Sequence, residues 1–168
     1  AKKYKNIDIL VLNTGGPPSK DFFEISQQEW DQAHNQLFLG FCILLQNIKI
    51  NKNGYIFLIS SFNIKEPNQS LILSNAYRLA FTSVFKSLSK IYAEKRISCI
   101  NLALGPFVTD RLKSLVKDID KFATTMPMKY VAKPEELANF VNSIVENKIN
   151  YISGVTINID GALSNYVL

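Results

Sequence analysis

The chain has 168 residues, of which 47% are apolar and 20% charged, and its formal net charge is +5. This composition is typical of one globular domain, and no apolar run reaches the ~18 residues that a membrane-spanning helix requires. The lysines are scattered rather than gathered in a stripe, so neither a nucleic-acid nor a membrane partner is expected. Because His34 is the only histidine, we also expect no histidine metal cluster and no Ser-His-Asp triad.

The first predicted element is a strand at Ile7–Leu12, an apolar run that ends at the turn sequence Asn-Thr-Gly-Gly-Pro-Pro. An apolar run of this length, stopped by turn residues, is typical of a strand buried on both faces. Ser26 followed by Glu29 has the spacing of a capping box. This spacing predicts a helix that begins there and continues through "WDQAHNQLFLGFCILLQNI".

The alternation of strands and helices continues to the end of the chain. Further strands are predicted at Tyr55–Ser60, Ser98–Leu104 and Val155–Ile159. Helices are predicted at Leu73–Lys95 and from Pro134, with short helices over a cleft at 109–131.

This element order predicts an α/β fold with a parallel sheet in chain order, right-handed crossovers and helices on both faces. No internal repeat or linker interrupts the chain, so it is interpreted as one domain or part of one. Cys42 and Cys99 lie in apolar runs without metal-ligand partners. Their setting favours buried, reduced thiols and a cytoplasmic protein.

An ordered set of segments resembles the short-chain dehydrogenase/reductase family, whose fold is Rossmann-like and doubly wound. The segments are "NTGG", "LISS", "SNAYR", "GPFVT", "KPEELA" and "YISGVTINIDGA". The first resembles the family's Asn-Asn-Ala-Gly turn, and the third stands where the family has Tyr-x-x-x-Lys. The pair "NTGGPP" and "LSN…R" is most similar to a divergent subgroup that resembles 3-oxoacyl-(acyl-carrier-protein) reductases.

The resemblance implies that the chain is the C-terminal part of such a fold. The family's first strand, glycine-rich turn (Thr-Gly-x-x-x-Gly-x-Gly) and first helix have no counterpart here, so residues 1–168 are expected to form a single incomplete domain. The strand at Ile7–Leu12 supports the same expectation without the family, because an apolar strand at a free sheet edge is an aggregation hazard. We expect this strand to have a free side, or to be covered by another chain.

The resemblance also implies an altered active site. The family uses an Asn-Ser-Tyr-Lys set, in which tyrosine is the general acid or base and lysine lowers the tyrosine pKa and binds the cofactor ribose. The serine place holds Ser61, but the tyrosine, lysine and asparagine places hold Ser74, Arg78 and Leu37. Arg78 keeps a positive charge yet cannot be deprotonated. Ser74 is shorter than a phenol, and its acidity lies far from the operating pH.

Alternative roles exist for three residues of the long helix. Tyr77 shares a broad helix face with Ser74 and Arg78 and would replace the missing phenol, or its ring would pack against the neighbouring helix. Ser74 would be the N-cap of the helix rather than a catalytic residue. Arg78 would contact a cofactor or phosphate, or would belong to a structural ion pair.

The cofactor that the resemblance implies is a nicotinamide dinucleotide, NAD or NADP. In the family, the loop after the strand that corresponds to Ser98–Leu104 contacts the nicotinamide amide. This loop lies at the carboxyl end of the strand, where ligands of open α/β sheets bind. The segment 109–131 would be a substrate lid, and Phe107, Phe122, Met126 and Met128 would line an apolar pocket or belong to the core. The candidate cofactor contacts are Asn13, Thr14, Gly15, Gly16, Arg78, Gly105, Pro106 and Thr109.

Two functions stay open at this point. The first is a nicotinamide-dependent oxidoreductase acting on a small carbonyl or alcohol, which Ser61, Gly105 and Thr109 favour. The second is a cofactor-binding or scaffold relative without efficient chemistry, which Leu37 and Ser74 favour. In both cases a symmetric homo-oligomer, dimer or tetramer, is expected, because the two long helices are apolar over more than one stripe and the family pairs them.

Overall fold

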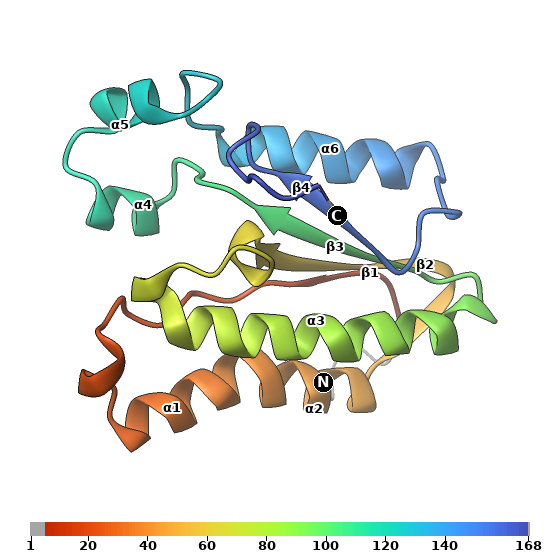
Figure 1. Ribbon diagram of the computed structural model, residues 1–168. Helices are drawn as coiled ribbons and strands as arrows, with labels where there is room; N and C mark the ends of the chain where they lie inside the picture. The colour runs from red at the N-terminus through yellow and green to blue at the C-terminus, as the bar shows by residue number, and fades with distance from the viewer. Residues whose placement is uncertain (1–5, 168) are drawn as a thin grey trace.

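A parallel sheet of four strands forms the centre of the structure, a computed structural model that describes residues 6–167 (Figure 1). The strands are β1 (Asn6–Leu12), β2 (Lys49–Ser61), β3 (Ser98–Leu104) and β4 (Val155–Ile159). They lie side by side in chain order, and every neighbouring pair is parallel, so the predicted α/β fold and strand order are confirmed. β2 begins earlier than predicted because its first residues pair with the start of β1 before the register shifts.

Helices cover both faces of the sheet (Figure 1). One face is covered by α2 (Gly40–Asn47) and α3 (Ile72–Ala93), with α1 (Gln27–His34) beside α3, and the other by α6 (Pro134–Glu146). Side chains that alternate along β2 enter the two cores in turn, as the pleat of a strand requires: Ile56 and Leu58 face α3, and Tyr55 and Phe57 face α6. Both cysteines are free thiols in the first core or at its margin.

The helix predicted after Ser26 is present, but it is not α-helical throughout. A π-helical segment, η2 (Asn35–Leu39), separates α1 from α2. The N–H of Gly40 donates to the carbonyl oxygen of Asn35, and a Cβ at Gly40 would stand 2.8 Å from that oxygen. Glycine therefore permits the wider turn, and π-helical segments of this kind often occur beside functional sites.

Short helices fill the connections at the carboxyl ends of the strands. Two of them, α4 (Asp110–Leu115) and α5 (Ile119–Thr125), lie beyond the tip of β3, in the segment predicted as a lid (Figure 1). Three 3-10 turns complete the elements: η1 (Phe22–Glu24), η3 (Phe62–Ile64) and η4 (Gln69–Leu71). None of the helices in residues 6–167 is long and apolar enough to cross a membrane.

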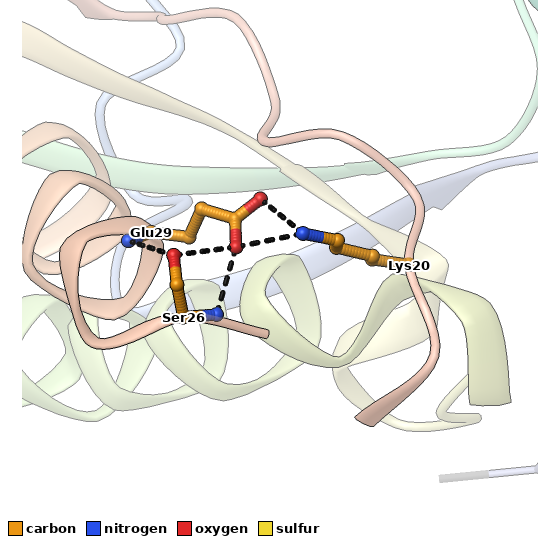
Figure 2. Close-up of polar contacts among 3 residues, drawn as sticks. All are labelled: Lys20, Ser26 and Glu29. Carbon is orange, nitrogen blue, oxygen red and sulfur yellow. Dashed lines mark hydrogen bonds and ion pairs between the residues drawn. The ribbon is translucent and has the colours of Figure 1, made fainter. Parts of the chain in front are cut away.

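The predicted capping box at the start of α1 is confirmed (Figure 2). The Ser26 hydroxyl accepts from the Glu29 N–H at 3.3 Å, and the Glu29 carboxylate accepts from the Ser26 N–H at 2.8 Å. Lys20 adds an ion pair to the same carboxylate at 3.0 Å. Hydrogen bonds from the Ser26 backbone and hydroxyl, followed by Lys20, lower the pKa of Glu29 from 4.5 to about 2.

This depressed pKa predicts an acid-sensitive contribution to stability. The contribution is present above the ordinary carboxyl pKa and is lost as pH falls from about 4.5 to about 2, because the unfolded chain binds the proton more tightly. The difference in unfolding free energy between wild type and Glu29→Gln should therefore shrink over this range, as measured by urea unfolding. Glu24→Gln, which removes the same charge nearby, is the control. If its difference from wild type in unfolding free energy shrinks equally, the effect does not come from the pKa of Glu29.

β1 lies at an edge of the sheet and has a free side, as expected. Its apolar run also predicted burial on both faces, and within residues 6–167 this prediction is wrong. The exposed fractions of Ile9 and Val11 are 44% and 49%, whereas Leu12 is buried at 1%. A hollow of about 510 Å³ continues from this edge towards α6, with Leu137 and Val141 among the residues that line it. The free side of the sheet is therefore apolar.

Candidate functional site

A cavity of about 520 Å³ opens at the carboxyl ends of β1, β2 and β3. The turn after β1, the start of α3, the loop after β3 and helix α4 supply its walls. It brings together every predicted cofactor contact and three of the four catalytic candidates. These residues are Asn13, Thr14, Gly15, Gly16, Ser61, Ser74, Arg78, Gly105, Pro106 and Thr109.

Arg78 connects three parts of the cavity wall. Its Nε donates to the Ser74 Oγ at 3.1 Å, its Nη1 to the carbonyl of Ile59 at 2.9 Å and its Nη2 to that of Thr14 at 3.4 Å. No carboxylate of residues 6–167 forms an ion pair with it, so the structural ion pair is not found in the described part of the chain. Burial lowers the pKa of Arg78, but an arginine stays cationic at neutral pH.

Ser74 is not the N-cap of the long helix, so this alternative is wrong. α3 begins at Ile72, and its N-cap residue, Leu71, makes no side-chain cap hydrogen bond. Ser74 instead lies in the first turn, where its oxygen accepts from Arg78. The oxygen of Ser61 accepts from the Asn63 N–H at 3.2 Å. Both serine oxygens accept from N–H donors, which leaves each hydroxyl hydrogen to bond an oxygen in the cavity.

Tyr77 and Leu37 lie away from the cavity. The Tyr77 ring contacts Trp30 and His34 of α1, with centroid distances of 6.0 and 5.5 Å. Leu37 is 1% exposed. These contacts support the packing alternative for Tyr77, because it points from α3 towards α1 rather than towards Ser61.

The loop after β3 is held against the next strand. The N–H of Gly105 donates to the Ile159 carbonyl at 2.9 Å, and a Cβ at Gly105 would stand 2.7 Å from the Asp160 Cα. The Thr109 hydroxyl caps α4 by accepting from the Leu112 N–H at 3.3 Å. Gly105 therefore allows the close approach, and Thr109 caps the start of α4.

The sequence did not point to two side chains that contact the turn after β1. Gln36, in the π-helical segment, donates to the Thr14 hydroxyl at 2.9 Å and to the Gly15 carbonyl at 3.0 Å. Arg111, in α4, donates to the Pro17 carbonyl at 2.9 Å. The available signals were local: Gln36 precedes the asparagine place, and Arg111 follows Thr109 by two residues.

The chemistry of the cavity is that of hydroxyls, amides and guanidinium groups. Its lining contains no Asp, Glu, His, Lys, Cys or Tyr among the described residues, so it holds no side chain that exchanges a proton near neutral pH. Within residues 6–167, no cluster of His, Cys, Asp and Glu is positioned to hold a metal ion. The described lining can thus donate hydrogen bonds and positive charge.

The methionines of the predicted lid line a different hollow. A volume of about 450 Å³ beside α6 and β4 is lined by Met126, Met128 and Phe140, together with Phe107, which lines both cavities. Phe122 lines neither of them. Only the first part of segment 109–131 therefore faces the site.

Comparison with known proteins gives one family model, described as Enoyl-(Acyl carrier protein) reductase, that matches residues 1–164. A 3-oxoacyl-(acyl-carrier-protein) reductase of Aquifex aeolicus is 30% identical, over 94% of this chain and 65% of the relative. The corresponding reductase of Buchnera aphidicola subsp. Baizongia pistaciae is 26% identical, over 96% of this chain and 68% of the relative.

A solved structure shows the same fold. The L-sorbose reductase of Gluconobacter frateurii, complexed with NADPH and L-sorbose, is 22% identical, with a TM-score of 0.86 over 99% of this chain and 70% of that protein. The chain thus spans about two thirds of the length of the proteins that it matches.

Proposed function

Because this chain belongs to the short-chain dehydrogenase/reductase family and is similar to 3-oxoacyl-(acyl-carrier-protein) reductases, we propose that the intact protein is a nicotinamide-dependent oxidoreductase that interconverts a small carbonyl compound and its alcohol. The observation that carries the proposal is the meeting of Ser61, Ser74 and Arg78 in one cavity at the carboxyl ends of the strands.

The two serines supply hydrogen bonds to the carbonyl oxygen of the substrate. Each hydroxyl accepts from a fixed N–H donor, Asn63 for Ser61 and Arg78 for Ser74, and so has its own hydrogen available. The cation of Arg78 behind Ser74 strengthens that donor and favours negative charge on the oxygen. The site stabilises a developing alkoxide, but no lining residue delivers a proton to it readily.

The residues present fit a dinucleotide. A nicotinamide dinucleotide, NAD or NADP, supplies or accepts hydride when bound. A Cβ at Gly16 would meet no atom within 4 Å, so the turn after β1 leaves room for a ligand against its backbone. Arg78 has N–H donors beyond those that its three contacts use, and these would hold ribose hydroxyls.

One set of observations favours the second function, a dinucleotide-binding or scaffold protein with impaired chemistry. The asparagine place is a buried leucine, Leu37, and the phenol that precedes Arg78, Tyr77, packs against α1. General acid–base help is typically worth about 100- to 10,000-fold in rate. We therefore expect carbonyl reduction to be slow rather than absent.

The deciding experiment measures binding and turnover separately on the intact protein. NADH and NADPH are titrated by their fluorescence, and steady-state reduction is then followed with a panel of ketones and acyl thioesters. Saturable dinucleotide binding with slow reduction supports the oxidoreductase. Binding without any turnover supports the scaffold alternative, and the lack of both would refute the two proposals together.

We further propose that the intact protein is a homo-oligomer that pairs the outer surfaces of α2 and α3. Ile43 and Leu79 stand on these helices with exposed fractions of 51% and 49%. Light scattering should give a dimer or tetramer, and Ile43→Glu with Leu79→Glu should shift it towards the monomer, because a charge at an apolar interface is costly. Phe23→Glu, at a 92% exposed position outside these helices, is the control. A wild-type monomer would contradict the proposal.

We also propose that residues 1–168 are one incomplete domain, and that a further element of the intact protein covers β1. The support is the apolar free side of this strand, with Ile9 and Val11 about half exposed. Expressed alone, residues 1–168 should self-associate, because an uncovered apolar edge strand recruits other chains. Size-exclusion chromatography with urea unfolding tests this, and a soluble monomer that unfolds cooperatively would show the proposal to be wrong.

A further inference from the structure

The cavity at the carboxyl ends of β1, β2 and β3 carries an unbalanced positive charge. Arg78 and Arg111 are the charged side chains that line it, and no carboxylate of residues 6–167 lines it or pairs with either of them. Buried and partly buried charges in proteins are normally paired. Arg78 is partly buried and has no such partner, and the exposed Arg111 adds a second guanidinium to the same cavity, so the two together can bind an anion.

Both arginines bind the turn after β1, although they belong to different helices. Arg78, half-buried on α3, donates to the Thr14 carbonyl, and Arg111, exposed at the mouth on α4, donates to the Pro17 carbonyl. These contacts hold the guanidinium groups in place and still leave N–H donors on each. An anion that enters the cavity meets donors that are already ordered, so little side-chain entropy is lost on binding.

We propose that this cavity binds the acid group of an anionic carbonyl substrate, a carboxylate or a phosphate, through Arg111 with Arg78 beside it. The inference rests on the proposed oxidoreductase function and names its substrate class. Ser61 and Ser74 hold the carbonyl oxygen, and Arg111 holds the acid group of the same molecule, with the positive charge of Arg78 nearby. The leucines of the lid, Leu112 and Leu115, line the same cavity and suit a short apolar segment between the two groups.

The test compares two compounds that differ only in charge, 3-oxobutanoate and its methyl ester, on the intact protein with the dinucleotide that it binds. Wild type should favour the acid in kcat/KM. Arg111→Gln should reduce the ratio of acid to ester by about 10- to 100-fold, the range that one charge-assisted hydrogen bond contributes. Arg111→Lys, which keeps the charge, should retain most of the preference.

Lys113→Gln is the matched control. It removes one positive charge from the same helix, but Lys113 does not line the cavity, and its side chain is 60% exposed. The preference for the acid should therefore persist in this variant. If Lys113→Gln reduces the ratio as much as Arg111→Gln does, the effect is one of general surface charge and the inference is wrong.

A second arm separates the substrate from the phosphates of the dinucleotide. Dinucleotide affinity is measured by fluorescence, and 3-oxobutanoate affinity by calorimetry without the dinucleotide. If Arg111→Gln weakens the dinucleotide and leaves the acid preference intact, Arg111 serves the cofactor and the inference is overturned. Equal treatment of acid and ester by wild type overturns it as well. If neither compound is reduced but 3-oxobutanoate binds in an Arg111-dependent manner, the oxidoreductase proposal fails while the anion site stands.

Discussion

Replacing Ser74 by Tyr and Arg78 by Lys together should raise the rate of carbonyl reduction by about 100- to 10,000-fold, the range of a positioned general acid. Ser74 lines the cavity with Ser61, so a phenol at this position would project towards the same space, and the cavity of about 520 Å³ gives it room. A lysine one helical turn later would place its ammonium beside the phenol and lower the phenol pKa. The measurement is steady-state reduction of the ketone and thioester panel.

Three controls define the result. The single variant Ser74→Tyr tests whether Arg78 alone activates the phenol, although its guanidinium is held by the Ile59 and Thr14 carbonyls. Tyr77→Phe should leave the rate unchanged, because the Tyr77 ring lies against Trp30 and not in the cavity. Arg78→Lys gives up charge-assisted contacts worth about 1.5 to 3 kcal/mol each, so the melting temperature of every variant is recorded.

Other outcomes would change the account of the site. A wild-type enzyme that is already fast, with Tyr77→Phe silent, would mean that another proton donor exists. A fast wild type that Tyr77→Phe inactivates would mean that the tyrosine function has moved along α3. A double variant that stays folded, binds the dinucleotide and remains slow would show that the absence of an asparagine at position 37 is enough to prevent fast reduction.

The elements of the fold were predictable because their signals are local. Apolar runs bounded by turn residues marked the strands, and the spacing of Ser26 and Glu29 marked the start of α1. The alternation of strands and helices then left few topologies, since crossovers between parallel strands are almost always right-handed. The π-helical segment was missed because a backbone hydrogen bond from Gly40 to Asn35 leaves no pattern in side-chain polarity.

Most of the candidate residues that meet in the cavity could be named from the sequence, but the directions of their side chains could not. Spacing along α3 placed Tyr77 on a broad face with Ser74 and Arg78, and packing against Trp30 decided which way the ring turned. The same limit applies to Arg111, because only the folded loop brings its guanidinium to the Pro17 carbonyl. Contacts between segments that are distant in the chain depend on the assembled core, which a single sequence does not encode in any local motif.

Gly105→Ala should destabilise the protein by about 1 to 3 kcal/mol, because overpacking against atoms that cannot move away has costs of this size. The added Cβ would stand 2.7 Å from the Asp160 Cα, which is backbone, where the Gly105 N–H bonds the Ile159 carbonyl. Gly16→Ala is the matched control, since its Cβ would meet nothing within 4 Å. Gly16 is also absent from the described glycines with positive φ, so alanine there should be neutral or slightly stabilising.

Thermal and urea unfolding of the intact protein measure this difference. The melting temperature of Gly105→Ala should fall by about 2 to 4 °C for each kcal/mol lost, while that of Gly16→Ala should stay close to wild type. Because the strain lies at the base of the loop that carries Thr109, dinucleotide affinity should fall in Gly105→Ala even below its melting range. Equal melting temperatures for the two variants would mean that β3 and the chain after β4 can move apart at no cost, and that the close approach at Gly105 does not hold the site together.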